Sequence, residues 1–112
     1  MKEEKFKIIQ FIKDLIIVIE KELINFPKKD IEIKNRIRTN TYDLLEICYQ
    51  ANATSNVEKK IELLEEAIAK IKVVDFLLNI SYERELITHK KLIKIALKLD
   101  DIIKYISGWL KK

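Results

Sequence analysis

The chain has 112 residues, which is the size of one domain, so we expect a single unit over 1–112. It contains one glycine and one proline, and so few turn-forming residues exclude a fold built from many short strands. A net charge of +4, with 36% charged residues of both signs, is ordinary for a helical surface and does not by itself indicate a nucleic-acid-binding protein.

The first predicted helix spans about 3–26, and Pro27 ends it. The residue before a proline disfavours the helical region of backbone conformation, so the chain should turn at 27–30. Apolar residues recur at three- and four-residue steps, which is the spacing of one helical face. The expected inner face of this helix is Phe11 or Ile12, Leu15, Ile19, Leu23 and Phe26.

The second predicted helix spans about 31–51 and the third about 56–85, with a polar loop at 52–56 between them. Asp30 is the expected N-cap of the second helix, and Ser55-Asn-Val-Glu58 has the S-x-x-E pattern of a capping box for the third. The expected inner faces are Ile33, Ile37, Thr41, Leu44, Cys48 and Ala51 in the second helix, and Ile61, Leu64, Ile68, Ile71, Val74 or Asp75, and Leu78 in the third.

The fourth predicted helix spans about 88–110, with Thr88 as its N-cap. Ser81 is an alternative cap, which would place the break several residues earlier. Four long helices joined by short connections predict an all-α fold, an antiparallel up-down-up-down four-helix bundle. The expected inner face of the last helix is Leu92, Ile95, Leu99, Ile102, Ile106 and Trp109.

Residues for catalysis or metal binding are scarce. His89 is the only histidine and Cys48 the only cysteine, and this pair predicts neither a metal site nor a nucleophile with its base. The acids at 65–66 and 100–101 are sequence neighbours, which do not face one another on a helix. One glycine rules out a glycine-rich phosphate loop. We therefore expect no enzymatic activity, no catalytic residue, no metal and no cofactor.

The single cysteine suits a reducing compartment, because it allows no internal disulfide. The longest apolar run, at 15–19, is too short to cross a bilayer, which takes about 20 residues. The N-terminal residues carry acids and lack the apolar stretch of a signal peptide. We expect a cytoplasmic protein without a membrane partner.

Basic residues gather in two places. Lysine stripes of this kind can contact nucleic-acid phosphates, although a solvated helical face would have the same composition. Aromatic residues do not interleave with the basic ones, so the expected mode is backbone recognition without base stacking. The candidate residues are Lys90, Lys91, Lys94 and Lys98 in the fourth segment, and Lys28, Lys29, Lys34, Arg36 and Arg38 around the start of the second.

The first and fourth segments also carry more apolar residues than one inner stripe requires. This surplus indicates an interface with another subunit or a partner, unless the core-facing stripes are simply wide. The residues concerned are Ile8, Ile9, Ile16, Ile17, Val18 and Ile24, and Ile93, Leu97 and Ile103.

The sequence as a whole resembles the Avd-like four-helix-bundle family. This family includes the accessory variability proteins of diversity-generating retroelements and the bundle proteins encoded in intervening sequences of bacterial 23S ribosomal RNA genes. The similar stretches occur in the order and spacing of the family and cover almost the whole chain. They are NFPKKD at 25–30, KNRIR at 34–38, YDLLEICYQAN at 42–52, LLEEAIAKIKVVDFLLN at 63–79, ELITHKK at 85–91 and ISGWLKK at 106–112.

The resemblance implies a bundle that assembles into a homo-oligomeric ring, a pentamer in the Avd branch, without an activity of its own. It implies binding to a reverse transcriptase and to template RNA or cDNA in support of mutagenic retrohoming. The basic residues named above occupy the family's basic regions, although +4 is modest beside the strongly basic Avd proteins. The alternative is a self-assembling bundle of the 23S intervening-sequence type, which has no nucleic-acid role.

The one glycine stands directly before the one tryptophan, at Gly108 and Trp109, near the end of the last helix. A glycine inside a helix costs about 0.5–1 kcal/mol relative to alanine, so a gain elsewhere should offset it. We expect Gly108 to allow the close approach of a neighbouring helix or subunit, while Trp109 fills the end of the bundle. The alternative is that Gly108 begins the fraying of the last turn.

Overall fold

The structure, a computed structural model, describes the backbone of residues 2–111 and the side chains of residues 7–111. Within these residues there are four long helices, one short 3₁₀ helix and no strand, so the all-α prediction is confirmed. The elements are α1 (Lys2–Leu23), the 3₁₀ helix η1 (Lys28–Asp30), α2 (Ile31–Ala53), α3 (Val57–Glu83) and α4 (His89–Leu110).

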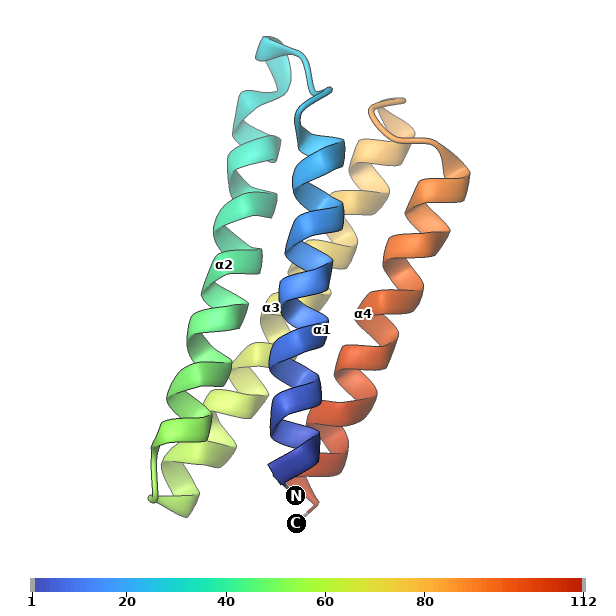
Figure 1. The fold of residues 1–112 in the computed structure, drawn as a ribbon. Coiled ribbons are helices and arrows are strands. Elements are labelled where there is room, and N and C mark those ends of the chain that lie inside the picture. Colours follow the sequence, from blue (N-terminus) through green and yellow to red (C-terminus); the bar gives the residue numbers. More distant parts are fainter. Residues whose placement is uncertain (1, 112) are drawn as a thin grey trace.

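Successive helices run in opposite directions and form a bundle about 43 Å long (Figure 1). Helix α1 packs against α2 and α4, and α3 packs against the same two helices. Among the described residues, neither α1 and α3 nor α2 and α4 make close backbone contact, so these pairs lie on the diagonals. The α1–α2 and α3–α4 connections therefore share one end of the bundle, and the α2–α3 connection lies at the other (Figure 1).

The core lies along the axis, where all four helices bury one apolar stripe. Every predicted inner residue of α2 and α4 is buried, and so are the predicted residues of α1 apart from Phe11, for which Ile12 takes the inner position. The prediction for Ile61 in α3 is wrong, because its side chain is 40% exposed. The other predicted residues of α3 are buried, apart from Ile68, which is half-buried against the core, and the stripe widens to include Leu63, Ala67 and Leu77.

Helix α1 ends at Leu23, three residues before the predicted end. The amides of Asn25 and Phe26 bond to carbonyls three residues back, so the chain tightens before Pro27. Phe26 is nevertheless buried, as predicted, because this tight turn folds its ring back onto the core. The predicted third helix also ends early, at Glu83.

The helix caps agree only partly with the predictions. Thr88 caps α4 as expected, since its hydroxyl oxygen accepts a hydrogen bond from the amide of Lys91 at 3.2 Å. The capping box with Ser55 is wrong, because Asn56 caps α3 by accepting from the amide of Lys59 at 3.1 Å. Asp30 occupies the N-cap position of α2 but makes no capping hydrogen bond with its side chain.

Helix α3 ends in a left-handed residue that is not a glycine. Glu85 has φ 63°, its amide bonds to the carbonyl of Tyr82, and the amide of Leu86 bonds to the carbonyl of Ser81. These two bonds form a Schellman motif, in which glycine is the usual left-handed residue. Ser81 is buried inside α3, where its hydroxyl donates to the carbonyl of Leu77, so the alternative break at Ser81 does not occur.

Gly108 lies inside α4, which continues to Leu110. Among the described residues, a Cβ atom added at this position would meet no atom of another helix within 4 Å. Within the described part of the chain, the expected close approach of a neighbouring helix is therefore wrong. Trp109, by contrast, is only 7% exposed and packs in the core near the end of the bundle.

Part of the predicted apolar surplus belongs to the core. Ile8 and Ile16 are buried, and Ile9, Val18 and Ile103 are half-buried against the core. Four residues stay well exposed, at 40% or more of their surface: Ile17, Ile24, Ile93 and Leu97.

An apolar face joins α1 to α2. Ile17 and Ile24 recur with Lys13 and Glu20 at three- and four-residue steps, so these four side chains share one side of α1. Lys13 lies over the ring of Tyr49, and Glu20 pairs with an arginine of α2, which shows that this side of α1 adjoins α2. We call the exposed apolar residues here the α1–α2 apolar face: Ile17, Ile24, Ile31, Tyr42 and Tyr49.

Replacing Glu85 with glycine should stabilise the protein by about 0.5–1 kcal/mol, because glycine adopts φ 63° without a steric cost. Chemical denaturation of wild type and Glu85→Gly would measure the change. Glu85→Ala is the control, since it removes the carboxylate but keeps the Cβ atom, and we expect no gain from it. A loss of stability in Glu85→Gly would contradict the prediction.

Replacing Gly108 with alanine should raise the free energy of unfolding by about 0.5–1 kcal/mol, because the added methyl group meets open space and improves helix propensity. Thermal unfolding followed by circular dichroism would test this, with sedimentation run in parallel. A drop in stability, or a change in association state, would instead mean that a second copy packs against Gly108.

Candidate nucleic-acid interface

The two predicted basic clusters lie at the same end of the bundle. One begins at η1 and the start of α2, and the other at the start of α4, and both starts are at the end that holds the α1–α2 and α3–α4 connections (Figure 1). Lys28 and Lys29 in η1 are exposed at this end. We call it the basic end. The antiparallel order thus brings together basic residues that are some 60 positions apart in the sequence.

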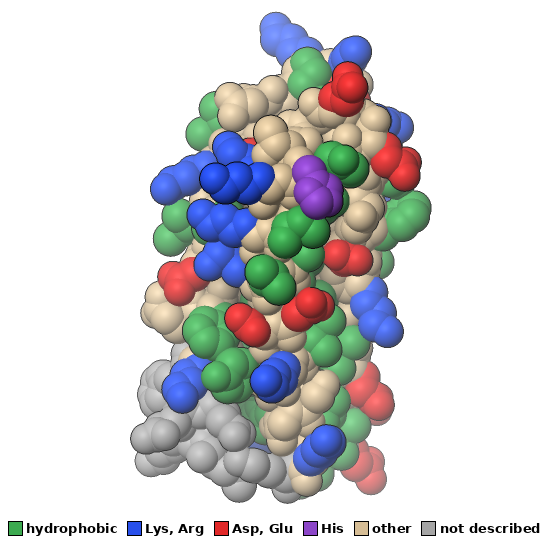
Figure 2. All heavy atoms as spheres, turned by 90° about the vertical axis from the view of Figure 1, so that its right-hand side faces the viewer, with side chains coloured by type: hydrophobic (Ala, Val, Ile, Leu, Met, Phe, Trp, Pro, Cys, Tyr) green, Lys and Arg blue, Asp and Glu red, His purple; other side chains and the backbone are tan. Residues whose placement is uncertain are grey.

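The cluster on α4 faces α1. Lys90, Lys91 and Lys94 are exposed, Lys98 is half-buried, and the ammonium of Lys91 lies 3.0 Å from a carboxylate oxygen of Glu22 in α1. Basic side chains gather along one edge of the face shown in Figure 2, in the half that also holds the histidine. Three of the four predicted lysines of this cluster, Lys91, Lys94 and Lys98, therefore lie on or near the α1 side of α4.

A groove of about 290 Å³ runs between α1 and α4 at this edge. Two of its basic residues, Lys91 and Lys94, were predicted, whereas Lys21 from the last turn of α1 was not. Lys21 stands alone among apolar and acidic neighbours in the sequence, so only the packing of α1 beside α4 reveals its place. We call this feature the lysine groove; its lining residues are Val18, Lys21, Glu22, Lys91, Lys94 and Ile95.

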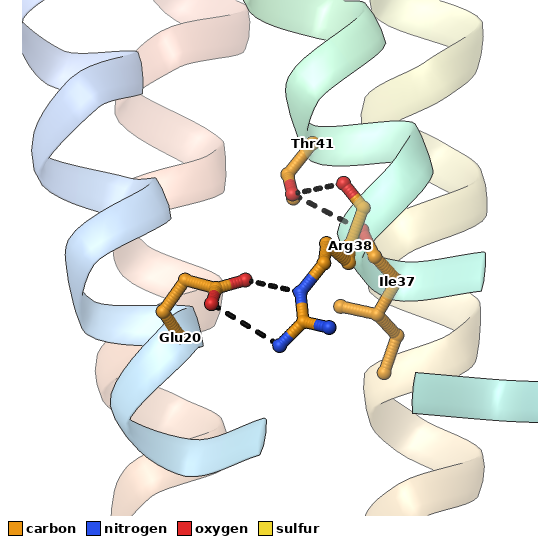
Figure 3. Close-up of polar contacts among 4 residues, drawn as sticks. All are labelled: Glu20, Ile37, Arg38 and Thr41. Carbon is orange, nitrogen blue, oxygen red and sulfur yellow. Dashed lines mark hydrogen bonds and ion pairs between the residues drawn. The ribbon is translucent and has the colours of Figure 1, made fainter. Parts of the chain in front are cut away.

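The predicted cluster on α2 does not form one surface. Arg38 faces α1, where its guanidinium donates to both carboxylate oxygens of Glu20, at 2.7 and 3.2 Å (Figure 3). Arg36, two residues earlier, faces the other side and lines a groove with Lys70 of α3. Lys34 is half-buried. Residues two apart on a helix point in different directions, which explains the division.

Glu20 and Arg38 form a partly exposed ion pair with two hydrogen bonds. The hydrogen bonds with Glu20 raise the pKa of Arg38 above its ordinary value, although partial desolvation opposes this. The hydroxyl of Thr41, one turn further along α2, donates to the carbonyls of Ile37 and Arg38 (Figure 3). Because Arg38 already donates two hydrogen bonds to Glu20, any phosphate that binds Arg38 must compete with this carboxylate.

A second ion pair ties the two connections of the basic end together. The guanidinium of Arg84, which follows α3, donates to Asp30 of η1 at 3.2 Å. The side chain of Asp30 is 8% exposed, and its second carboxylate oxygen is buried with no hydrogen-bond partner among the described residues. Asp30 was predicted to cap α2, but its carboxylate serves this contact instead.

The opposite end of the bundle is more acidic. The last turns of α2 and the first turns of α3 meet there (Figure 1), while Asp43, which pairs with Lys70 at 3.3 Å, lies near the middle of the bundle. The bundle is therefore electrostatically asymmetric along its length. The other acids in these two segments are exposed: Glu46, Glu58, Glu62, Glu65 and Glu66.

His89 and Cys48, the only histidine and the only cysteine of the chain, lie apart from one another. His89 at the start of α4 packs its ring against Tyr82, with 5.5 Å between ring centres. Cys48 is fully buried in α2, and burial raises the pKa of its thiol to about 12, so it stays protonated and unreactive in the folded protein. Within the described residues, no three histidine, cysteine or acidic side chains are grouped as metal ligands would be.

No protein-family model, curated protein or solved structure matches the chain. None of the helices in the described part of the chain combines the length and the apolar character needed to cross a membrane. The basic end and the lysine groove are the features of the described residues that bear on function.

Replacing Arg84 with glutamine should destabilise the protein by about 1 kcal/mol, because it leaves the enclosed carboxylate of Asp30 without its cation. The effect is small because Arg84 itself is 57% exposed and its charge is screened by water. Urea denaturation would measure the change, with Arg36→Gln, an exposed arginine without such a partner in the described structure, as the control. Equal stability of the two variants would contradict the prediction.

Proposed function

We propose that this chain is a non-enzymatic scaffold that binds the phosphate backbone of nucleic acid at its basic end. The lysine groove is the observation that carries the proposal. Two ammonium groups from α4 and one from α1 line a single groove, and Lys98 follows one turn further along α4. Several cations along one groove suit a chain of phosphates, because each contact releases a condensed counterion.

The charge at the start of α4 supports the proposal independently. The first turn of this helix holds His89, Lys90 and Lys91 and no acid. Cations at a helix N-terminus oppose the helix dipole, and each costs a few tenths of a kcal/mol in stability. A local conflict of this kind is expected where a residue serves function more than folding.

The resemblance to Avd proteins extends the proposal to a biological role. In this reading the chain is the cytoplasmic accessory protein of a diversity-generating retroelement. It assembles as a homo-oligomer, a pentamer, and holds the reverse transcriptase together with template RNA or cDNA during mutagenic retrohoming. The α1–α2 apolar face supplies surface for subunit or polymerase contact, since five large apolar residues are exposed on it.

The second candidate function is a self-assembling bundle of the 23S intervening-sequence type without a nucleic-acid role. The same apolar face favours it, because self-association needs that face and makes no use of the lysine groove. Under this candidate the lysines at the start of α4 are a solvated surface. The two candidates therefore differ in binding to nucleic acid and agree in assembly.

Charge reversal separates the two candidates. We expect wild type to bind a fluorescein-labelled RNA hairpin with an affinity that falls steeply with salt concentration. The slope of log K against log salt should become shallower by about 2–3 in the triple variant Lys21→Glu, Lys94→Glu, Lys98→Glu, because each phosphate that a lysine neutralises adds about 0.7–0.9 to it. Fluorescence anisotropy over a salt series would measure both slopes.

The matched control reverses three lysines away from the basic end, Lys7, Lys59 and Lys104, which are exposed and change the net charge equally. This control should keep the wild-type slope. Wild-type binding that responds neither to salt nor to either triple variant would reject the nucleic-acid function. An oligomer in sedimentation velocity without such binding would favour the second candidate.

A further inference from the structure

Glu22 stands where an acid would weaken the proposed interface. It lines the lysine groove, its side chain is only 13% exposed, and a carboxylate oxygen lies 3.0 Å from the ammonium of Lys91. Lys91 itself is 49% exposed, so the acid is the more enclosed partner. The carboxylate therefore lies within the groove and is not a chance contact at its rim.

Glu22 also compensates the cations in the first turn of α4, which oppose the dipole of that helix. That first turn has no acid of its own, and Glu22 reaches it from the last turns of α1. A carboxylate near a helix N-terminus is favourable, and a phosphate at the same place is favourable for the same reason. Glu22 and a phosphate group thus satisfy the same cation in the same way.

We propose, resting on the nucleic-acid function proposed above, that Glu22 is an internal competitor for phosphate in the lysine groove. In the free protein its carboxylate neutralises Lys91. When a phosphodiester backbone enters the groove, Lys91 exchanges Glu22 for a phosphate oxygen. Glu22 thereby stabilises the unbound fold, lowers the affinity for nucleic acid and sets how strongly binding depends on salt.

The exchange has a signature in salt dependence. In wild type the displaced carboxylate of Glu22 stays beside the groove, so the contact between Lys91 and phosphate adds no net neutralisation and releases no further condensed cation from the RNA. In Glu22→Gln, Lys91 neutralises one phosphate without that opposing charge, and the cation condensed on this phosphate is released. The slope of log K against log salt should therefore steepen by about 0.7–0.9, the value for one phosphate contact. Affinity for the RNA hairpin at low salt should rise about two- to fivefold.

The matched control is Glu83→Gln, which makes the same substitution and charge change at the same end of the bundle, on the exposed last turn of α3. It should raise affinity slightly through long-range charge alone and leave the slope as in wild type. The Lys91→Gln background supplies a second test, because Glu22→Gln should change neither slope nor affinity beyond the control when Lys91 is absent.

Anisotropy titrations of the RNA hairpin over a salt series, with circular dichroism to verify folding, measure all of these values. Equal effects of Glu22→Gln and Glu83→Gln, or a gain that persists in the Lys91→Gln background, would overturn the proposal. Wild-type binding that is insensitive to salt would instead reject the underlying nucleic-acid function, so the two failures are distinct.

Discussion

The burial of one apolar stripe on each of four helices determines how the helices are arranged and which charged residues meet at each end of the bundle. The connections are short, so each helix must reverse against its predecessor to bury its stripe. This reversal puts the start of α2 and the start of α4 at one end, beside the last turns of α1 (Figure 1). Basic residues from two distant parts of the chain meet there, while acids of α2 and α3 gather at the opposite end.

Helix α1 links stability to the proposed binding surface. It contacts both α2 and α4, and it offers an acid to each: Glu20 to Arg38 on one side and Glu22 to Lys91 on the other. These contacts join the two flanks of α1 to its neighbours, and they also neutralise cations that a polyanion would use. In the folded protein without ligand, the basic end therefore carries less uncompensated positive charge than its number of basic residues suggests.

The two sides of α1 carry different chemistry. The side toward α2 exposes isoleucines and adjoins the tyrosines of α2, whereas the side toward α4 borders the lysine groove. Assembly through the apolar face and phosphate binding in the groove would use separate surfaces. A scaffold needs that separation, because it must hold its copies together and still present its ligand site to solvent.

The sequence by itself determined the helical class, the number of helices and the inner faces of α2 and α4, since residue spacing and capping are local properties. It misplaced Ile61 and the α3 cap. Which side chains of α3 are buried depends on its neighbouring helices, and which residue caps it depends on the side chain that reaches the amide of Lys59. Only the tertiary structure decided which basic residues share a surface: it added Lys21 to the α4 lysines and placed Arg38 beside Glu20 of α1. The physical reason is that a helix stripe specifies the face turned to the core, while the neighbour on either flank depends on the hand in which the bundle closes, and no local spacing encodes that hand.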